Sequence, residues 1–451
     1  MKLTFFGGAK AVTGANYLLE SGDTRILVDC GLKQGGAFCE KDNFEPFKYN
    51  PSEIDAVFVT HAHIDHIGLI PRLYKEGFRG TVFSTPPTKD FAEELLLDSE
   101  DILGREAERQ GKPHIYDEKD IEGVMNLWKT NTYHREVVVK DFKATFYDAG
   151  HVLGSSCVML EAEGKKILFS GDLGNSPAPL IKDPEVIEGA DYVLMESTYG
   201  GRVHESKEER KNLLEDVIES TFQDGGVLMI PAFAMERTQE ILYELNELVE
   251  NGRIPDVPIF LDSPLAIKLT AVYKKYVNDA DYFDKEARDR VSSGDAIFNF
   301  PRLKMTLKTE QSKAIKDEPA PKVIIAGSGM SQGGRIVHHE TNYLPDPKNT
   351  ILMVSYQAAN SLGRRIFEGD KRVKIMGRDV EVRARVKAIG GYSSHADQNG
   401  LMNWLRPMRD TVKKVFLVQG EEDQMIPLQT LIRDRLALDT IIPETGDVVE
   451  L

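Results

Sequence analysis

The sequence has few cysteines, and none of them are paired at the spacing of a metal or redox motif. Its three cysteines, Cys30, Cys39 and Cys157, are odd in number, irregularly spaced and outside any Cys-x-x-Cys pattern. A disulfide framework and a thiolate zinc site are therefore not expected. We expect the three thiols to behave as small, semi-buried apolar side chains.

Long apolar runs are lacking too. No stretch of about 18 apolar residues occurs, so we expect no membrane-spanning helix and no membrane partner. Residues 1–8 form a short apolar patch ended by glycines, without the apolar stretch of about 7–15 residues that a secretory signal has. The sequence thus predicts a cytoplasmic protein that begins with a β-strand.

Positive charge is in deficit, with 72 acidic against 56 basic residues and a formal net charge of −16. This balance argues against a protein coated with basic surface for nucleic acid. Segment 364–387 departs from it, because it is rich in arginine and lysine. This segment could contact phosphates locally, or it could be a strand edge guarded by solvated basic side chains, and the sequence leaves both open.

The order of the expected elements indicates one domain inserted into another. The chain of 451 residues is long enough for two or three domains, at about 100–200 residues each. Its first 200 residues favour short strands that end in Gly, Asp or His, as loops that carry chemistry do. Strands then alternate with helices, which is typical of a parallel α/β sheet, and the last stretch returns to short strands and one helix.

The strands expected in the first part are Lys2–Phe6, Tyr17–Glu20, Arg25–Val28, Ala56–Thr60, Thr81–Ser84, Val137–Tyr147, Cys157–Glu161, Lys166–Ser170 and Tyr192–Glu196. The later elements expected are helix Glu205–Phe222, strand Gly226–Ile230, helix Arg237–Val249, strand Ile259–Leu261, strand Val323–Ala326, helix Gly334–Tyr343 and strand Ile351–Ser355. Residues 300–320 are expected to be a polar surface excursion.

The clearest chemical signal is the run Thr60–His66, which reads Thr-His-Ala-His-Ile-Asp-His. It follows an apolar strand, and residues two apart in extended backbone point the same way, so His61 and His63 can converge on one point. The turn that follows can carry Asp65 and His66 toward a second point nearby. Imidazoles and carboxylates are ligands that zinc prefers. With only ten histidines in the chain, a chance surface turn explains this cluster poorly.

This His-x-His-x-Asp-His run resembles the signature of the metallo-β-lactamase superfamily. Val28–Gly31 is similar to the first motif of that family, Ala149–Ser155 to the third and Phe169–Gly174 to the fourth. Alone, each of these three is a weak signal, since a Gly-Asp pair after a strand is usually a turn. Their order and spacing after the histidine run make the set specific. The resemblance implies an αββα sandwich.

The same resemblance implies two Zn²⁺ ions per chain, bridged by hydroxide. One zinc ion would be held by His61, His63, His151 and Asp172. The other would be held by Asp65, His66, the shared Asp172 and one further ligand, and Asp65 would also be catalytic. Asp29 would support the ligands from behind.

Later motifs resemble the β-CASP subfamily, the branch that cuts nucleic acid and includes the pre-mRNA 3′-end endonuclease and ribonuclease J. Met195–Gly200 is similar to its motif A, and Gly390–Asp397 to its motif B. The similarity covers essentially the whole chain. It implies an inserted α/β β-CASP domain at 202–386, between metallo-β-lactamase parts at 1–201 and 387–451. Because the chain begins at the catalytic fold, we expect no KH-domain extension of the archaeal kind.

Two sites in the inserted domain are candidates for substrate binding. Ser328, Gly329 and Met330 lie in a glycine-rich segment between a strand and a helix, and resemble a loop that faces substrate in the family. Such a loop can offer backbone N–H groups to a phosphate, or it can simply be a tight turn. Arg237 opens a helix after a strand and could clamp phosphate, or it could be an ordinary surface helix start.

A histidine and a glutamate are candidates for proton transfer. His395 follows a Gly/Ser loop, which suits a catalytic histidine better than a core one. Glu196 ends an apolar strand and could orient His395, or it could cap a helix or form an ion pair. The other histidines, including His338 and His339, lie in polar segments and are expected at the surface.

One position departs from the family's pattern. Motif C usually reads His-Gly-Glu after a strand, whereas here Gln419 precedes Gly420 and Glu421. The expected fourth ligand of the second zinc ion is thus a glutamine, whose amide oxygen is neutral and binds zinc more weakly than imidazole does. The second ion would be labile, or water would complete its coordination.

Together these motifs predict a zinc-dependent ribonuclease that acts on single-stranded RNA and leaves 5′-phosphate and 3′-hydroxyl ends. Two alternatives stay open: an RNA-binding homologue weakened at Gln419, and a metallo-hydrolase of a small ester. The inserted domain, motif A and His395 count against the small-ester alternative. The sequence leaves open whether cleavage is internal or from the 5′ end, the RNA target, and whether the chain assembles into a homo-oligomer.

Overall fold

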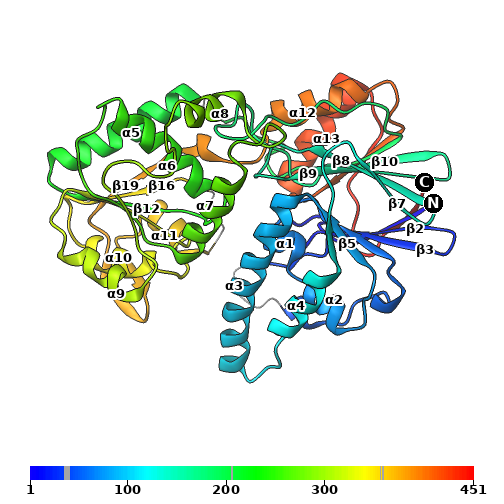
Figure 1. Ribbon diagram of the computed structural model, residues 1–451, viewed down its shortest axis with the longest axis horizontal. Coiled ribbons are helices and arrows are strands. Elements are labelled where there is room, and N and C mark those ends of the chain that lie inside the picture. The colour runs from blue at the N-terminus through cyan, green and yellow to red at the C-terminus, as the bar shows by residue number, and fades with distance from the viewer. Residues whose placement is uncertain (35–40, 205–206, 356, 358–359) are drawn as a thin grey trace. The chain divides into compact units, whose positions relative to one another are not determined.

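The computed structural model describes residues 1–34, 41–204, 207–355, 357 and 360–451 (Figure 1). These residues divide into two compact units. The first unit comprises Met1–Val203 and His395–Leu451, and the second comprises His204–Ser394. Cys39 and the expected helix start at Glu205 lie outside the described residues, while Cys30 and Cys157 are both buried free thiols.

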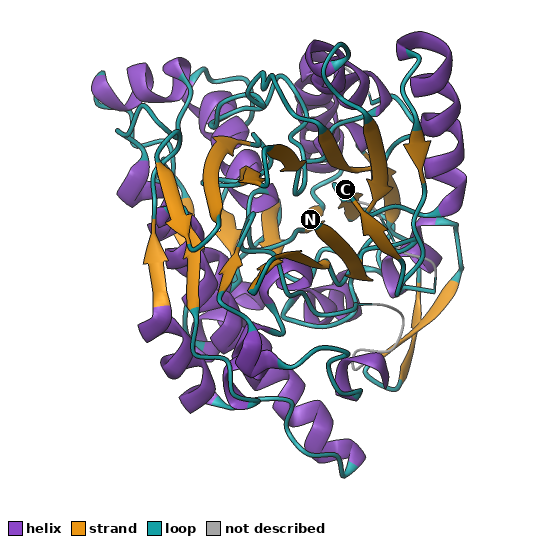
Figure 2. Ribbon diagram, turned by 90° about the vertical axis from the view of Figure 1, so that its right-hand side faces the viewer, coloured by secondary structure: helices purple, strands orange, loops and turns teal. Residues whose placement is uncertain are grey.

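Two seven-stranded sheets form the centre of the first unit. In spatial order, one consists of β22 (Val448–Glu450), β1 (Lys2–Gly7), β2 (Asn16–Ser21), β3 (Thr24–Val28), β4 (Ala56–Phe58), β5 (Thr81–Ser84) and β6 (Trp128–Thr130). The other consists of β21 (Thr440–Ile441), β20 (Lys414–Val418), β11 (Tyr192–Glu196), β10 (Lys165–Phe169), β9 (Ser156–Ala162), β8 (Phe142–Asp148) and β7 (Glu136–Val139). Because β22 pairs with β1, the two termini of the chain lie side by side (Figure 2).

Helices cover the outer faces of both sheets, which gives the αββα order expected from the sequence (Figure 1). The helices of the first unit are α1 (Ile64–Ile67), α2 (Ile70–Lys75), α3 (Pro86–Gln110), α4 (Glu118–Leu127), α12 (Gln398–Leu405) and α13 (Glu422–Leu436), with short 3-10 turns at Lys41–Phe44, Pro51–Glu53 and Arg406–Met408. Leu401 and Leu405 of α12, with Leu428 of α13, pack in one buried cluster with Leu168 and Val193 of the sheet. The apolar stripe of each helix therefore completes the core.

The second unit is built on a sheet of six parallel strands. Its order is β14 (Leu303–Met305), β13 (Ile259–Leu261), β15 (Lys322–Ala326), β12 (Val227–Pro231), β16 (Thr350–Met353) and β19 (Arg385–Ala388). The central strands β12 and β15 are buried at every position, as strands covered on both faces are. A separate hairpin consists of β17 (Arg372–Ile375) and β18 (Arg378–Glu381).

Helices lie on both faces of this parallel sheet (Figure 1). They are α5 (Lys207–Gln223), α6 (Arg237–Glu250), α7 (Pro264–Tyr276), α8 (Lys285–Ser292), α9 (Thr309–Ala314), α10 (Ile336–Tyr343) and α11 (Leu362–Phe367), with 3-10 turns at Ile315–Asp317 and Gly390–Tyr392. The loops that leave the carboxyl ends of parallel strands are the usual place for ligands in such sheets. Here those loops carry Arg237 and the Ser328–Met330 segment.

Two local expectations differ from the structure. Val137–Tyr147 is a hairpin of β7 and β8, not one strand, because a turn at Lys140-Asp141 interrupts it. The excursion at 300–320 contains edge strand β14 and helix α9. The domain boundaries expected from the sequence stay a prediction. Among the described residues, no helix has the length and apolar character needed to cross a bilayer.

Candidate metal centre

The histidine run leaves the end of strand β4 and enters helix α1. Val59 still pairs with the sheet through Phe83, and His63 takes the extended conformation that begins the helix. His61 and His63 are thus on extended backbone, whereas Asp65 and His66 are on the first turn of α1. The change from strand to helix is what directs the two pairs of side chains to different points.

His61, His63, His151 and Asp172 form a compact group, in which one ligand atom of each lies within 4.8 Å of the others. His63 Nδ1 is 3.0 Å from His61 Nε2 and 3.2 Å from His151 Nε2. Asp172 Oδ2 is 3.4 Å from His61 Nε2 and 3.5 Å from His151 Nε2. Three imidazole nitrogens and one carboxylate at these separations are the donor set of a tetrahedral zinc site.

The charge states in this group suit a metal. Burial, helped by the neighbouring imidazoles, holds the pKa of His63 and of His151 well below the usual value, so both rings are neutral. Burial raises the pKa of Asp172, but the surrounding His66 and His61 lower it more, so Asp172 stays an anion. Neutral imidazole and ionised carboxylate are the forms that coordinate a metal ion.

Two motif glycines allow the loops of this centre to approach one another. A Cβ at Gly31 would lie 1.5 Å from the Asp65 carbonyl oxygen, and a Cβ at Gly174 would lie 1.7 Å from the Gly150 carbonyl oxygen. Any side chain at either position would push apart the loops that carry Asp65 and His151. The glycines of the first and fourth motifs are therefore packing requirements of the centre.

Asp29 lies behind the histidine run and fixes it. Its carboxylate accepts hydrogen bonds from the backbone N–H and the hydroxyl of Thr60, both at 2.8 Å. It also lies 2.7 Å from His66 Nδ1, and because a carboxylate accepts, that nitrogen carries the hydrogen. His66 Nε2 faces away from Asp29, toward Asp65 and Asp172. Thr60 was not a candidate from the sequence, although it opens the histidine run.

The second group contains Gln419. His66 Nε2 is 3.4 Å from Asp172 Oδ1 and 3.8 Å from Asp65 Oδ2. Gln419 follows β20, and its side-chain nitrogen lies 2.7 Å from Asp172 Oδ1 and 2.9 Å from His66 Nε2. The structure thus brings the motif C position to the second group, as the sequence places it. It brings an amide there rather than an imidazole.

His395 and Glu196 are adjacent to this centre. His395 Nδ1 lies 3.1 Å from Glu196 Oε1 and 3.9 Å from Asp172 Oδ2. Glu196 is fully buried and also accepts the backbone N–H of Leu173 at 2.6 Å. Burial lowers the pKa of His395, but the charges of Glu196 and Asp172 raise it to about 9, so the ring carries a proton at neutral pH.

The glycine-rich segment in the second unit is a tightly bonded loop between β15 and α10. The Ser328 hydroxyl accepts the backbone N–H of Gln332 at 3.1 Å, and the Met330 carbonyl accepts the N–H of Gly363 at 3.0 Å. The Gly329 carbonyl accepts from the Gln357 amide at 2.9 Å. These bonds hold the loop in one shape, and its role in substrate binding stays a prediction.

Arg237 does not lie at an exposed helix start, which was the alternative that the sequence left open. It begins α6 but is buried, pairs with Glu240 and lies over the Tyr392 ring, with 5.5 Å from its guanidinium carbon to the ring centre. Its contact with a phosphate stays a prediction. Such a contact would have to compete with Glu240 for the guanidinium group.

Acidic partners neutralise part of the basic segment 364–387. The ion pairs are Arg364 with Glu368, Arg365 with Asp370, Arg372 with Glu381, and Arg385 with Asp224. Within the described residues, the basic side chains of this segment that form no ion pair are Lys371, Lys374, Arg378, Arg383 and Lys387. The segment therefore offers less free positive charge than its composition indicates.

One buried polar cluster was not expected. Asp262, directly after β13, is fully buried and accepts from Thr306, Ser312, Arg335 and His339 at 2.6–2.7 Å. His339 is therefore buried, which corrects the expectation of a surface position, while His338 is exposed. The position of Asp262 after an apolar strand was the signal that could have marked this one residue of the cluster. The cluster ties the carboxyl edge of the sheet to the start of α10.

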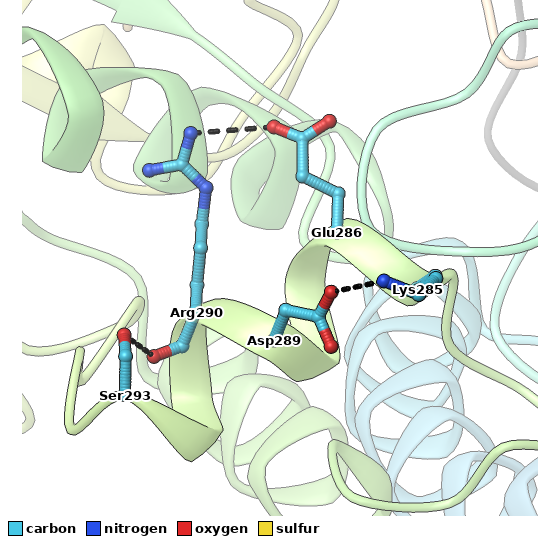
Figure 3. A pocket seen from close by; sticks show the side chains of 5 residues that line it. All are labelled: Lys285, Glu286, Asp289, Arg290 and Ser293. Carbon is cyan, nitrogen blue, oxygen red and sulfur yellow. Dashed lines mark hydrogen bonds and ion pairs between the residues drawn. The ribbon is translucent and has the colours of Figure 1, made fainter.

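A surface hollow lies away from the candidate site residues. It encloses about 560 Å³ along α8, and Figure 3 shows its lining, Lys285, Glu286, Asp289, Arg290 and Ser293. Lys285 pairs with Asp289, and Arg290 with Glu286. None of the candidate site residues lines this hollow.

Three family models match the chain. They are the metallo-beta-lactamase superfamily over residues 10–193, the Beta-Casp domain over residues 238–366, and the Zn-dependent metallo-hydrolase RNA specificity domain over residues 379–443. Together they span both units and the residues of the metal centre up to Gln419.

Curated relatives match over nearly the whole chain. Ribonuclease TTHA0252 of Thermus thermophilus is 38% identical, with 96% of each chain covered. An RNase J-like protein of Methanocaldococcus jannaschii is 33% identical, with 100% of this chain and 99% of its own covered. A transcription termination factor FttA of Methanosarcina mazei is 32% identical over 98% of this chain and 70% of its own length.

A solved structure also shares the fold. The crystal structure of a protein of unknown function from Enterococcus faecalis matches with a TM-score of 0.57 and 12% identity, over 100% of this chain and 99% of its own. At this identity the match concerns the fold alone.

Proposed function

Because this chain belongs to the metallo-β-lactamase superfamily, in the family that carries a Beta-Casp domain and an RNA specificity domain, we propose that it is a metal-dependent ribonuclease. The observation that carries the proposal is the compact group of three histidines and one aspartate with His395 and Glu196 beside it. That pairing combines a place for a metal ion with a proton donor. The substrate we propose is single-stranded RNA.

The donor set of the first group fits one zinc ion. His61, His63 and His151 would supply neutral nitrogens, and Asp172 would supply an anionic oxygen. Zinc bound there would supply a water of lowered pKa and positive charge beside a phosphoryl group. Asp29 would keep the histidine run in place through Thr60 and would orient His66.

At the second group the donor set differs from the expected one. Asp65, His66 and Asp172 are present, but an amide stands in the fourth position and its nitrogen faces Asp172 and His66. A second zinc ion was expected from the family pattern. The donors present do not fit that ion, so the proposed reaction uses the first group alone.

His395 would act as the general acid in this reaction. Its ring is protonated at neutral pH and Glu196 holds it, so it can give a proton to the departing 3′ oxygen of the RNA. The products would be a 5′-phosphate and a 3′-hydroxyl. No step uses the 2′-hydroxyl as a nucleophile, so single-stranded DNA would also be cut, more slowly.

The second unit would hold the RNA. The Ser328–Met330 loop would present backbone N–H groups to a phosphate, and Arg237 would contribute charge after exchange of its partner Glu240.

We also propose a cytoplasmic location, which cell fractionation tests. Assembly of identical chains would be tested by light scattering.

The decisive experiment offers the purified protein with zinc a circular RNA and a linear 5′-monophosphate RNA of the same sequence. Circular RNA has no ends, so its conversion to linear RNA requires internal cleavage. We expect linear products that a 5′-phosphate-dependent exonuclease then degrades. The matched inactive control is His63→Ala. If RNA is untouched while a lactone or nitrocefin is hydrolysed, the protein is a small-ester hydrolase and the proposal is wrong.

Gln419 favours one second candidate, an RNA-binding protein without cleavage. A missing imidazole in the second group would weaken catalysis while leaving the fold and the RNA-binding surfaces intact. An RNA that is retained but stays intact at saturating zinc would support this candidate. Release of 5′-phosphate ends would exclude it.

A further inference from the structure

The side chain of Gln419 lies between two groups that the family pattern assigns to a second metal ion. Its amide nitrogen is 2.7 Å from Asp172 Oδ1 and 2.9 Å from His66 Nε2, which are themselves 3.4 Å apart. Both contacts are within hydrogen-bond distance. The amide therefore spans the two atoms that a second metal ion would have to join.

Hydrogen bonding determines which end of the amide faces these atoms. The carboxylate of Asp172 accepts hydrogen bonds, so an amide oxygen 2.7 Å from its Oδ1 would be repelled. When the His66 ring is neutral, as a metal ligand must be, its hydrogen is on Nδ1, which faces Asp29 at 2.7 Å, and its Nε2 accepts. The NH2 group has two hydrogens to donate, one for each acceptor. The lone pairs that would bind a metal ion are thus already satisfied.

The surroundings keep the amide in this position. The Gln419 backbone N–H donates to the Gly8 carbonyl at 2.6 Å, and its carbonyl accepts from the Thr198 hydroxyl at 3.1 Å. The residue is 2% exposed. The cavity beside it measures about 10 Å³, at the lower limit of the roughly 10–15 Å³ that one water molecule needs. Burial and these backbone contacts hold Gln419 beside Asp172 and His66.

The other donors of the second group, Asp65 and His66, do not form a metal site of their own. In the part of the chain that the structure describes, the groups of three or more ligand atoms within 4.8 Å of one another are the first group and the set of Asp172, Glu196 and His395. Asp65 and His66 belong to neither. A second ion would therefore depend on the very atoms that the amide occupies.

We infer that the Gln419 amide takes the place of the second metal ion, so that this chain holds a single resident metal ion, at His61, His63, His151 and Asp172. Gln419 is then a hydrogen-bond donor to the metal centre, not a weak ligand in it. The inference rests on the proposed metal site of the first group. It makes the chain a one-metal member of a family whose pattern provides for two ions.

Two variants separate a blocking amide from a ligating one, because the two roles predict opposite effects of removing it. If Gln419 blocks the second position, Gln419→Ala gains a second zinc ion, with water completing its coordination. If Gln419 is a ligand through its oxygen, Gln419→Ala binds a second ion more weakly than the natural protein does. Gln419→His supplies an imidazole and reports the two-zinc state under the same conditions.

The measurement is zinc stoichiometry by native mass spectrometry during a zinc titration of the full chain. We expect the natural protein to stay at one zinc ion per chain where Gln419→His and Gln419→Ala reach two. Two ions in the natural protein, with a weaker second ion in Gln419→Ala, would overturn the inference. Circular dichroism checks that both variants are folded. If Gln419→Ala does not fold, the comparison of the natural protein with Gln419→His still tests the inference.

This readout is independent of RNA cleavage. A natural protein that binds one zinc ion but leaves RNA intact would contradict the proposed function and would still support this inference. A natural protein that binds no zinc ion at all would sink the proposed metal site, and with it this inference.

Discussion

His63 occupies the central position among the side chains of the first group. Its Nδ1 is close to both His61 Nε2 and His151 Nε2, whereas those two nitrogens belong to separate loops. We predict that His63→Ala loses the bound metal ion and RNA cleavage together. Elemental analysis by mass spectrometry measures the metal content.

His338→Ala is the matched control for this prediction, because His338 is an exposed histidine on α10. It should keep the metal content and the activity of the natural protein. Full zinc content in His63→Ala would show that His63 is not a ligand.

His395 has a different task from the histidines of the first group, because its close partner is Glu196, at 3.1 Å. We predict that His395→Ala keeps its metal ion and cuts RNA about 10²–10⁴-fold more slowly, the usual contribution of a general acid. Single-turnover cleavage at saturating zinc gives the rate, and elemental analysis gives the metal. A variant that loses zinc, or one that cuts at the natural rate, contradicts the assignment.

At the scale of elements, the loop between β15 and α10 depends on a buried carboxyl group. Glu340 of α10 is fully buried and accepts a hydrogen bond from the Ser331 hydroxyl, and among the described residues its other oxygen has no partner. Burial raises its pKa from 4.5 to about 7, against the smaller lowering effect of Ser331. Between pH 4.5 and about 7, Glu340 is therefore protonated in the folded protein but ionised in the unfolded chain.

This proton makes stability depend on pH. As the pH rises from 4.5 to about 7, the contribution of Glu340 to the free energy of unfolding is lost, by up to roughly 3 kcal/mol at about 1.4 kcal/mol per pKa unit. We predict that Glu340→Gln flattens this fall. Urea unfolding by circular dichroism near pH 5 and near pH 8 compares the two proteins. Exposed Glu310→Gln serves as control, and an unchanged pH dependence in Glu340→Gln would show that Glu340 is ionised throughout.

Sequence reasoning predicted the buried strands well, because β12 and residues 323–326 of β15 are short apolar runs, as strands covered on both faces are. It missed helix α3, although Thr85 caps its start, prolines follow at once and Gly111 ends it in a left-handed conformation. These start and stop signals are local and could have been used. The apolar pattern of α3 is weak, because its buried positions include Thr88, Ser99 and Gly104, and periodicity alone did not reveal it.

The candidate site also contains residues that the sequence could identify and contacts that it could not. The His61–His66 run and Gln419 could be identified from their motifs, because each follows an apolar strand at a fixed spacing. The contacts of Asp262 could not, since its partners come from three other segments of the chain. Nor could the sequence determine which end of the Gln419 amide faces Asp172. That orientation follows only from the hydrogen-bond partners that the fold assembles.

On the scale of the whole molecule, the net charge of −16 opposes the binding of an RNA polyanion. Binding must then rely on local positive charge, and segment 364–387 is the densest source in the sequence. Its arginines Arg364, Arg365, Arg372 and Arg385 are already paired with acidic groups. A paired arginine gains less from a phosphate, because it gives up one anion to bind another. Lys374 and Lys387 are exposed and form no ion pair among the described residues, so they are the better candidates.

We therefore predict that RNA affinity falls steeply with salt and that the unpaired lysines set the slope. Each phosphate contact on a single strand adds about 0.7 to the slope of log affinity against log salt. Lys374→Ala and Lys387→Ala should each reduce this slope by about 0.7, whereas Arg372→Ala, whose partner is Glu381, should change it little. Fluorescence anisotropy with labelled RNA over a salt series measures the slope, in the slow-cutting His395→Ala background.

A flat salt response in His395→Ala without a further substitution would make the segment an ordinary solvated surface. An equal loss in Arg372→Ala would show that ion pairing does not withhold its charge from RNA.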